Sequence, residues 1–263
     1  GLYNDSIPVM EDRDGLIYEY EPFAEGTRAV YLDWESTLKF DAPTLRLDGA
    51  TALYPVYSAF VQAVYPEAKY DIYDFKYNEE DGYGQVTCTG TIEAYERLIR
   101  GDTDIIFCAA PSKDQLALAE RMGVQLHLTP IGREAFVFFV NSENPVQGLT
   151  VEQIQGIYTG QIKNWRELGG RNQRIRPYQR AENSGSQSAL LRLMEGLPLM
   201  EPEKEDRIAG MGGIITQVAG YRNHKNAIGF SFRFYSTEMV ENEQIRLLAL
   251  NGVLPTKDTI REG

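Results

Sequence analysis

Three short segments combine small and hydroxyl-bearing residues at points where a strand should end and a helix begin. They are Asp-Gly-Ala-Thr-Ala-Leu at 48–53, Thr-Cys-Thr-Gly-Thr-Ile at 87–92 and Arg-Ala-Glu-Asn-Ser-Gly-Ser-Gln at 180–187. A helix start presents backbone N–H groups without intrahelical partners and the positive end of the helix dipole. Small residues let an anion approach that backbone, and hydroxyl groups add donors. The pattern indicates an oxyanion site built from three loops.

Arg180 opens the third segment, and its planar guanidinium can hold two oxygens of one anion. Each segment alone is also typical of an ordinary helix cap, because Ser and Thr are common there. The three segments together, with an arginine opening the third, favour anion binding.

The composition places further bounds on function. The chain has 263 residues, with 43% hydrophobic and 24% charged residues, which is typical of a soluble globular protein with one large or two modest domains. Its formal net charge of −12 argues against nucleic acid as a partner, since the sequence shows no basic patch to displace counterions. No apolar run approaches the roughly 20 residues of a membrane helix, and no signal peptide begins at Gly1.

Other kinds of chemistry have little support. Cys88 and Cys108 lack metal-ligand spacing, so buried free thiols are expected, with a single bridge between them as the alternative. His127 and His224 are the only histidines, and neither accompanies a nucleophile motif. We expect His127 to be structural, on a strand. No metal, cofactor or catalytic residue is predicted.

The elements that must position these loops alternate between strands and helices, which predicts an α/β fold with mostly parallel sheets. Strands are expected at 44–47, 104–108 (buried), 124–128, 134–140, 174–178 and 227–232. Helices are expected at 54–65, from Ile92 to a stop at Gly101, from a Ser112–Gln115 capping box to Gly123, after a Thr150–Gln153 capping box, at 186–194 and at 213–221. The acidic residues 1–43 show no period and predict an irregular N-terminal arm packed on the globular body.

Several of these segments resemble one known family, the phosphate-binding proteins of ABC phosphate transporters, in the periplasmic-binding-protein-like type 2 superfamily. The most specific are Leu-Thr-Val-Glu-Gln-Ile at 149–154, which continues to Ile-Tyr-Thr-Gly-Gln-Ile-Lys-Asn-Trp at 157–165 and Gly-Gly at 169–170, and the loop 180–186. Segments 48–55 and 101–112 also resemble the family. The similarity covers roughly Leu45 to Leu250.

The resemblance implies a two-lobed fold with a two-strand hinge. Residues 44–137 would form the first part of lobe 1, residues 138–228 lobe 2, and residues 229–263 the return to lobe 1. The two crossings would lie near Phe136–Val140 and Ala227–Phe232. Relatives usually continue for another strand and helix, so the return is expected to be shorter than theirs.

Carried over by motif, the phosphate-binding residues would lie on both lobes. Lobe 1 would supply Thr51, the backbone of Ala52, and Thr91, with Thr89 as the alternative to Thr91. Lobe 2 would supply a second set: Arg180, Ser184, Gly185 and Ser186.

One position departs from the family pattern. Many members carry an aspartate that accepts the proton of hydrogen phosphate, and Ala109 stands there in this chain. A buried acceptor is how a site prefers a protonated oxyanion to sulfate. Glu134 is the candidate to replace it, while an ion pair with Arg133 or a lysine is an equally good interpretation.

The implied function is that of an extracytoplasmic solute-binding protein that captures inorganic phosphate between its lobes for an ABC transporter. It would be a monomer without enzymatic activity or cofactor, and its partner would be a membrane permease. It would reside in the periplasm or at the cell surface, as a lipoprotein if a segment outside this chain anchors it. The alternatives are a binding protein or sensor for another oxyanion and a cleft enzyme such as a phosphoryl hydrolase.

Overall fold

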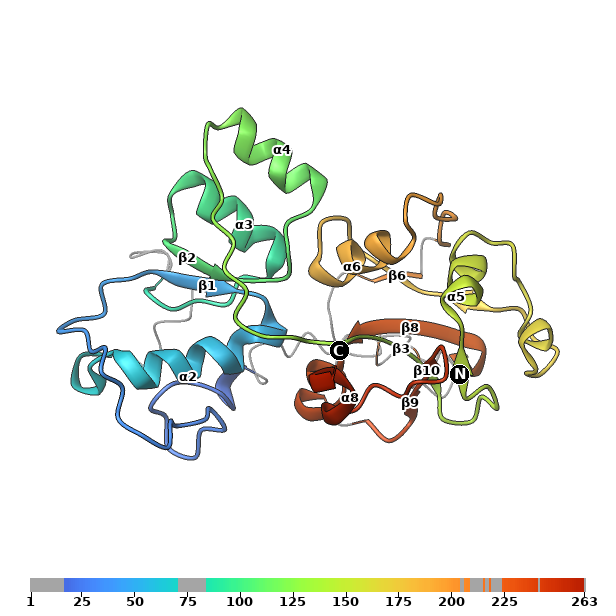
Figure 1. Ribbon diagram of the computed structural model, residues 1–263, viewed down its shortest axis with the longest axis horizontal. Coiled ribbons are helices and arrows are strands. Elements are labelled where there is room, and N and C mark those ends of the chain that lie inside the picture. Colours follow the sequence, from blue (N-terminus) through green and yellow to red (C-terminus); the bar gives the residue numbers. More distant parts are fainter. Residues whose placement is uncertain are drawn as a thin grey trace, which may run out of the picture. The chain divides into compact units, whose positions relative to one another are not determined.

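The structure is a computed structural model that describes residues 17–70, 84–203, 206–208, 215, 218, 224–240 and 242–262 (Figure 1). The chain forms two compact units. Unit 2 contains the described residues up to Thr129 together with Asn183–Gly185, and unit 1 contains Pro130–Glu182 and the described residues from Ser186 onward.

Unit 2 is built on a parallel pair of strands. β1 (Leu47–Gly49) pairs with β2 (Ile105–Phe107), and Val86 bridges to Leu47 on the other side of β1 in the same direction. The helices α2 (Tyr54–Val64) and α3 (Thr91–Arg100) lie on opposite sides of the pair in Figure 1. The 3₁₀ turn η1 (Thr51–Leu53) leads directly into α2, and α4 (Lys113–Arg121) follows β2.

Local sequence rules explain the helix ends of unit 2. α3 ends at Gly101, whose φ of 84° is the left-handed conformation that glycine adopts most readily. The Ser112 hydroxyl accepts the N–H of Gln115, and the Gln115 side chain accepts the N–H of Ser112, which completes the predicted capping box of α4. The predictions for both helices are confirmed.

The core of unit 2 is aromatic. Tyr54 and Tyr57 are fully buried, and the Tyr57 ring stacks on Phe107 with ring centroids 5.0 Å apart. The Tyr57 hydroxyl donates to the carbonyl oxygen of Thr87 at 2.8 Å. A Cβ atom at Gly49 would lie 2.5 Å from the carbonyl oxygen of Phe107, so only glycine fits between β2 and this ring.

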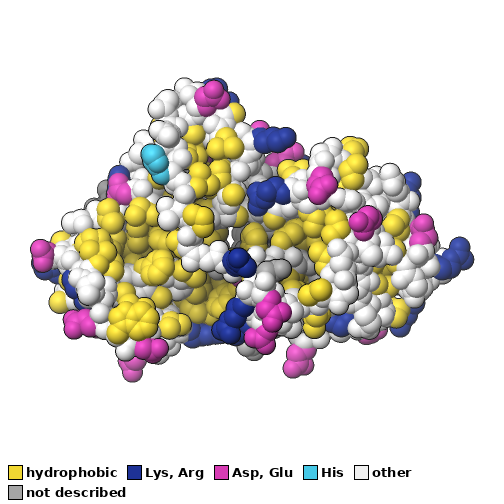
Figure 2. All heavy atoms as spheres, in the orientation of Figure 1, with side chains coloured by type: hydrophobic (Ala, Val, Ile, Leu, Met, Phe, Trp, Pro, Cys, Tyr) yellow, Lys and Arg dark blue, Asp and Glu magenta, His cyan; other side chains and the backbone are white. Residues whose placement is uncertain are grey.

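The described part of the N-terminal arm, residues 17–43, packs on α2. It has one helical turn at its start and is otherwise irregular, as predicted. The Gln62 side chain on α2 donates to the carbonyl oxygens of Ala29 and Val30, and Phe23 donates its N–H back to Gln62. Residues 1–16 lie outside the described part. Hydrophobic side chains also remain on the surface of unit 2 (left in Figure 2), and the exposed ones of the arm are Tyr18, Val30, Tyr31, Leu32, Trp34 and Leu38.

Unit 1 is organised around the central strand β3 (Phe136–Asn141). β3 pairs antiparallel with β8 (Ala227–Phe232) and β9 (Ile245–Leu247), and β5 (Arg176–Pro177) runs parallel to β8. Two further parallel pairs join β4 (Gly148–Leu149) to β10 (Ala249–Leu250) and β6 (Gln179–Arg180) to β7 (Arg207–Ile208).

One helix of unit 1 packs on this sheet through an aromatic side chain. α5 (Val151–Tyr158) carries the predicted Thr150–Gln153 capping box. The ring of Tyr158 packs against those of Phe138 and Phe230, with centroids 6.1 and 5.9 Å apart. The 3₁₀ turn η3 (Trp165–Leu168) buries Trp165. The remaining elements described are η2 (Glu67–Lys69, in unit 2), α6 (Gly185–Leu193), η5 (His224–Asn226), η6 (Tyr235–Met239) and α8 (Lys257–Glu262).

Several predictions need correction. Residues 124–128 form no strand, and His127 is exposed on an irregular segment rather than structural on a strand. The strand predicted at 44–47 begins only at Leu47, and β2 is half-exposed rather than buried. The four-stranded sheet is mixed, although four of the six strand pairings among the described residues are parallel. The helix predicted at 213–221 lies mostly outside the described residues.

The two units divide the chain at other positions than the family resemblance implies, and the lobe bounds stay a prediction. The units part between Thr129 and Pro130, before β3, rather than at 137–138. The residues described between 229 and 262 belong to unit 1, because β8 and β9 both pair with β3 and β10 pairs with β4.

Candidate anion-binding loops

The first two predicted loops lie side by side in unit 2. The chain at Val86, β1 and β2 run parallel, so their carboxyl ends meet at one edge. Contacts of the two cysteines agree with this placement. The Cys88 thiol lies 3.9 Å from the Thr51 hydroxyl, and the Thr91 side chain hydrogen-bonds to the Cys108 thiol. Thr51 and Ala52 are buried, and Thr91 is half-buried.

In the described chain, the helix starts of these loops lack side-chain caps, as do those of α2, η2 and η6. Side chains cap α4, α5 and η3, each through a complete capping box. No side chain caps η1 or α3 among the residues that the structure describes. Gly90 precedes α3 with a φ of 93° and has no side chain to offer. The first-turn N–H groups at Thr51–Ala52 and Thr91–Ile92 therefore stay available for an anion.

Thr89, the alternative to Thr91, has its hydroxyl committed elsewhere. It donates to the buried carboxylate of Asp48 at 2.7 Å, and the Thr89 N–H donates to the same side chain at 2.8 Å. Thr91, the first residue of α3, bonds instead to the Cys108 thiol, which is a much weaker acceptor than a carboxylate. The loop geometry thus favours Thr91 over Thr89.

The third predicted loop begins at Arg180 at the end of β6. Arg180 is only 7% exposed, and its guanidinium donates to the carbonyl oxygen of Ile208 at 3.1 Å and to the Ser186 hydroxyl at 3.3 Å. Burial lowers its pKa to about 10, and nearby Tyr235 opposes that shift. The cation is therefore held at a free-energy cost that a neighbouring anion would offset.

The loop itself is held by glutamines and by Asn183. The Gln187 side chain accepts the N–H of Arg180 at 2.8 Å and donates to the Gln179 side chain at 3.0 Å, which fixes the start of α6 beside β6. Asn183 has a φ of 64°, and its side-chain oxygen accepts the Ser112 hydroxyl at 2.8 Å. Ser184, Gly185 and Ser186 follow this turn and are buried.

The structure thus brings Thr51 near Thr91 in unit 2 and Arg180 near Ser186 in unit 1. The convergence of all the predicted residues on one cleft stays a prediction, as do their roles.

Ala109, which stands in place of the family's aspartate, and Glu134, the candidate proton acceptor, both have partners within their own units. The carbonyl oxygen of Ala109 accepts the Tyr95 hydroxyl at 2.8 Å. The Glu134 carboxylate accepts the N–H of Ala135 at 2.8 Å and of Phe234 at 3.2 Å. Partial desolvation raises the pKa of Glu134, against the effect of these N–H groups. Its closest partners are thus backbone groups rather than the Arg133 or lysine side chains considered from the sequence.

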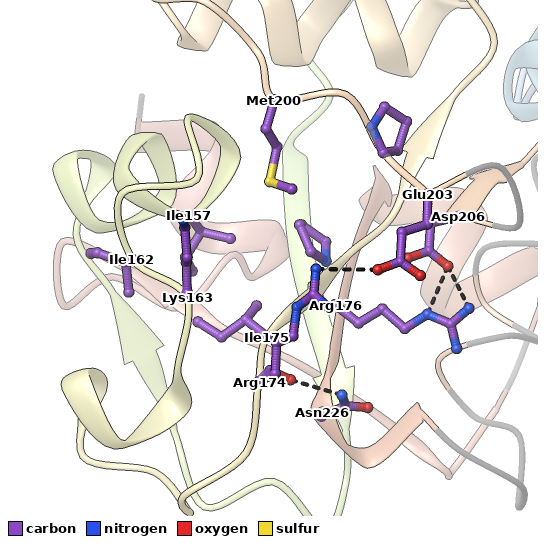
Figure 3. Close-up of a pocket in the computed structure, with 12 residues that line it drawn as sticks. Ile157, Ile162, Lys163, Arg174, Ile175, Arg176, Met200, Glu203, Asp206 and Asn226 are labelled. Atoms are coloured by element: carbon purple, nitrogen blue, oxygen red, sulfur yellow. Dashed lines mark hydrogen bonds and ion pairs between the residues drawn. The ribbon is translucent and has the colours of Figure 1, made fainter.

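Sequence reasoning missed two features. One is the ion pair of Asp48 with Arg97, both buried below the first two loops. The other is a pocket of about 610 Å³ in unit 1 (Figure 3). Arg174 pairs with Glu203 at 3.1 Å and Arg176 with Asp206 at 2.7 Å along its wall, and none of the predicted anion-binding residues lines it. It lies where β5 and β8 begin, whereas the loop 180–186 follows the end of β6.

Both cysteines are free, and β1 separates the chain at Cys88 from β2, which Cys108 follows. Burial raises the pKa of the Cys108 thiol above its usual range. In the described ranges, no three His, Cys, Asp or Glu side chains gather as metal ligands. No described helix has the length and apolar character to span a bilayer.

Two α/β units with helix starts at the ends of parallel strands are the architecture of two-lobed binding proteins. Comparison with protein families agrees, because residues 35–259 match the PBP superfamily domain. The chain belongs to the PBP superfamily. The match begins within the N-terminal arm, so residues 17–34 of the arm lie outside it.

Curated relatives are similar to this chain over part of their length. The phosphate-binding protein PstS of Bacillus subtilis is 29% identical over 125 residues, which covers 47% of this chain and 38% of that protein. PstS of Staphylococcus epidermidis is 25% identical over 181 residues, 66% of this chain and 54% of the relative. The chain thus matches about half, or less, of the length of these relatives.

Solved structures share the fold. A substrate-binding protein from Clostridium perfringens, solved with bound phosphate, superposes with a TM-score of 0.62 at 24% identity, covering 83% of this chain and 80% of the other. An ABC-type phosphate transport receptor from Vibrio cholerae gives 0.55 at 21% identity, with 83% and 81% covered.

Proposed function

We propose that this protein binds a small inorganic oxyanion, with phosphate as the first candidate, and delivers it to an ABC transporter. Thr51, the backbone of Ala52, and Thr91 are the donors proposed from unit 2. Arg180 and the Ser184–Ser186 run are those proposed from the third loop. The relatives described above are named phosphate-binding proteins, and this supports phosphate over other oxyanions as the ligand.

The observation that carries the proposal is that two uncapped helix starts lie together at one strand edge of unit 2. The helix starts at Lys113 and Val151 use side chains to satisfy their N–H groups, whereas η1 and α3, at one edge of β1–β2, do not in the described chain. Uncapped helix starts beside threonine hydroxyls suit an acceptor-rich ligand. With a net charge of −12, attraction of an anion has to come from such local donors.

We propose binding without turnover. The loops offer hydroxyl, amide and guanidinium donors, which stabilise an oxyanion, and no residue of the proposed site is a general base. The extracytoplasmic location, the monomeric state and docking on a permease belong to the same proposal, and the family membership supports them.

The test is a thermal unfolding series of the purified protein with phosphate, arsenate, sulfate and chloride, run beside a hydrolysis assay with a chromogenic phosphomonoester. We expect phosphate to raise the melting temperature in a saturable way and the assay to show no turnover. A melting temperature unmoved by every oxyanion would refute the proposed function, and steady hydrolysis would replace it with an enzymatic one.

A further inference from the structure

The carboxylate of Asp48 joins three elements of unit 2. Asp48 is fully buried in β1, and its Oδ1 accepts the N–H of Gly49 at 2.7 Å and the N–H of Thr89 at 2.8 Å. Its Oδ2 accepts the Thr89 hydroxyl at 2.7 Å and the guanidinium of Arg97 from α3. One side chain therefore fixes the end of β1, the second loop and the helix that follows this loop.

Arg97 balances the buried charge and extends the network. Its Nη1 also donates to the Thr87 hydroxyl at 2.8 Å, and that hydroxyl donates to the carbonyl oxygen of Leu47 at 3.2 Å. Arg97 is only 4% exposed. An unpaired carboxylate below two anion-binding loops would repel the ligand, and the guanidinium removes that penalty.

We propose that Asp48 is a positioning residue for the oxyanion site: it draws the Thr89 hydroxyl inward, which leaves Thr91 as the hydroxyl of the second loop that binds the ligand. This inference rests on the proposed function. Asp48 would contact no ligand itself. Its effect comes from holding Gly49 and Thr89, so that the N–H groups at Thr51 and Thr91, beyond these anchors, keep one orientation.

A purely structural ion pair predicts something different. Loss of a structural pair lowers the melting temperature and leaves the affinity of the folded protein unchanged. Loss of a positioning contact lowers the affinity of protein that is still folded at the assay temperature. Both quantities therefore have to be measured on each variant.

The experiment is calorimetric titration of inorganic phosphate into the full chain, with a thermal melt and far-UV circular dichroism for each variant. Asp48→Asn and Thr89→Val should each weaken binding about tenfold or more, because a hydrogen bond that involves a charged group is lost. Thr89→Ser restores the hydroxyl and should bind like wild type. Thr91→Val should weaken binding by a similar factor.

The matched control is Tyr65→Phe, which removes a hydroxyl bonded to the carbonyl oxygen of Leu45, before the amino end of β1. It should lower the melting temperature and leave the affinity unchanged. If Asp48→Asn does not fold, Thr89→Val against Thr89→Ser decides alone.

The outcomes separate the two proposals. Wild type that binds phosphate, with Thr89→Val binding equally well, overturns the positioning role of Asp48 and leaves the proposed function standing. Weak binding by Thr89→Val with Thr91→Val unaffected overturns the assignment of Thr91, since Thr89 would then be the ligand-binding hydroxyl. Wild type without affinity for phosphate, arsenate or sulfate overturns the proposed function and this role with it.

Discussion

The hydroxyl of Tyr54 donates a 2.8 Å hydrogen bond to the carboxylate of Glu21, and both side chains are buried. Tyr54 begins α2, three residues after Thr51, and its ring meets Tyr57 edge-on with centroids 5.1 Å apart. Burial, followed by the charge of Glu21, raises the pKa of Tyr54 far above its usual range, so the phenol stays protonated and donates. The N-terminal arm is thereby bonded into the core that carries the first loop.

Replacement of Glu21 by alanine should destabilise unit 2. The Tyr54 hydroxyl would lose its acceptor while buried, which costs about 1–3 kcal/mol. Chemical denaturation should show a lower free energy of unfolding for Glu21→Ala, and a much smaller loss for Glu21→Gln, which retains an acceptor. Glu19→Ala is the control, because the Glu19–Arg28 pair is exposed and such pairs contribute little. Equal effects at positions 19 and 21 would contradict this role of Glu21.

Gly49 should tolerate no side chain. Its replacement by alanine places a Cβ atom 2.5 Å from the carbonyl oxygen of Phe107 and 3.0 Å from the Tyr57 ring, so β1 and β2 have to separate. We expect Gly49→Ala to cost about 1–3 kcal/mol or more of stability, measured by urea unfolding. Gly132→Ala serves as the control, because nothing lies within 4 Å of a Cβ there and its φ is not positive. Similar stabilities for the two variants would show that β1 and β2 can separate at little cost in free energy.

Arg180→Ala should weaken phosphate binding by roughly 30- to 1,000-fold, which corresponds to about 2–4 kcal/mol for a buried charged contact. Titration calorimetry measures the change directly. Arg180→Lys should recover only part of the affinity, since an ammonium lacks the bidentate fork. The control Arg192→Ala changes an exposed arginine on α6, the helix that follows the third loop. Unchanged affinity in Arg180→Ala would remove this residue from the site.

The preference for phosphate over sulfate should depend on position 109 or position 134. Hydrogen phosphate carries a proton that needs an acceptor, whereas sulfate offers only acceptors. With Ala109, wild type should discriminate weakly, and Ala109→Asp should favour phosphate by about 1–3 kcal/mol in competition binding. If wild type already rejects sulfate and Glu134→Gln abolishes the preference, Glu134 is the acceptor instead.

Local rules explain which parts of the fold were predictable. The end of α3 at Gly101 and the capping boxes at Ser112 and Thr150 depend on residues within one helical turn, so the sequence alone predicts them. β8 was predicted at its observed bounds, because its apolar run is long and has clear flanks. The strand predicted at 124–128 failed because apolar residues form a strand only beside a partner, and pairing is not written in a local pattern.

The candidate site divides in the same way. The loops themselves could be predicted from the sequence, because small and hydroxyl residues at a helix start form a local pattern. The network of Asp48 could not, because Asp48 and Arg97 are 49 positions apart and meet only after β1 and α3 have packed. The choice between Thr89 and Thr91 depends on the contact of Thr89 with Asp48, which the sequence does not show, and so the sequence left it open.

The uncapped starts of η1 and α3 also determine how the empty loops are solvated. Amide groups without a capping side chain have to bond to water, and such bonds are nearly as favourable in enthalpy as direct ones. An arriving oxyanion replaces that hydration, so its gain comes from its charge and from the release of ordered solvent. A neutral molecule of the same shape would exchange hydrogen bonds with water for hydrogen bonds with the protein, and the gain in binding free energy would be small. These loops therefore discriminate by charge before they discriminate by shape.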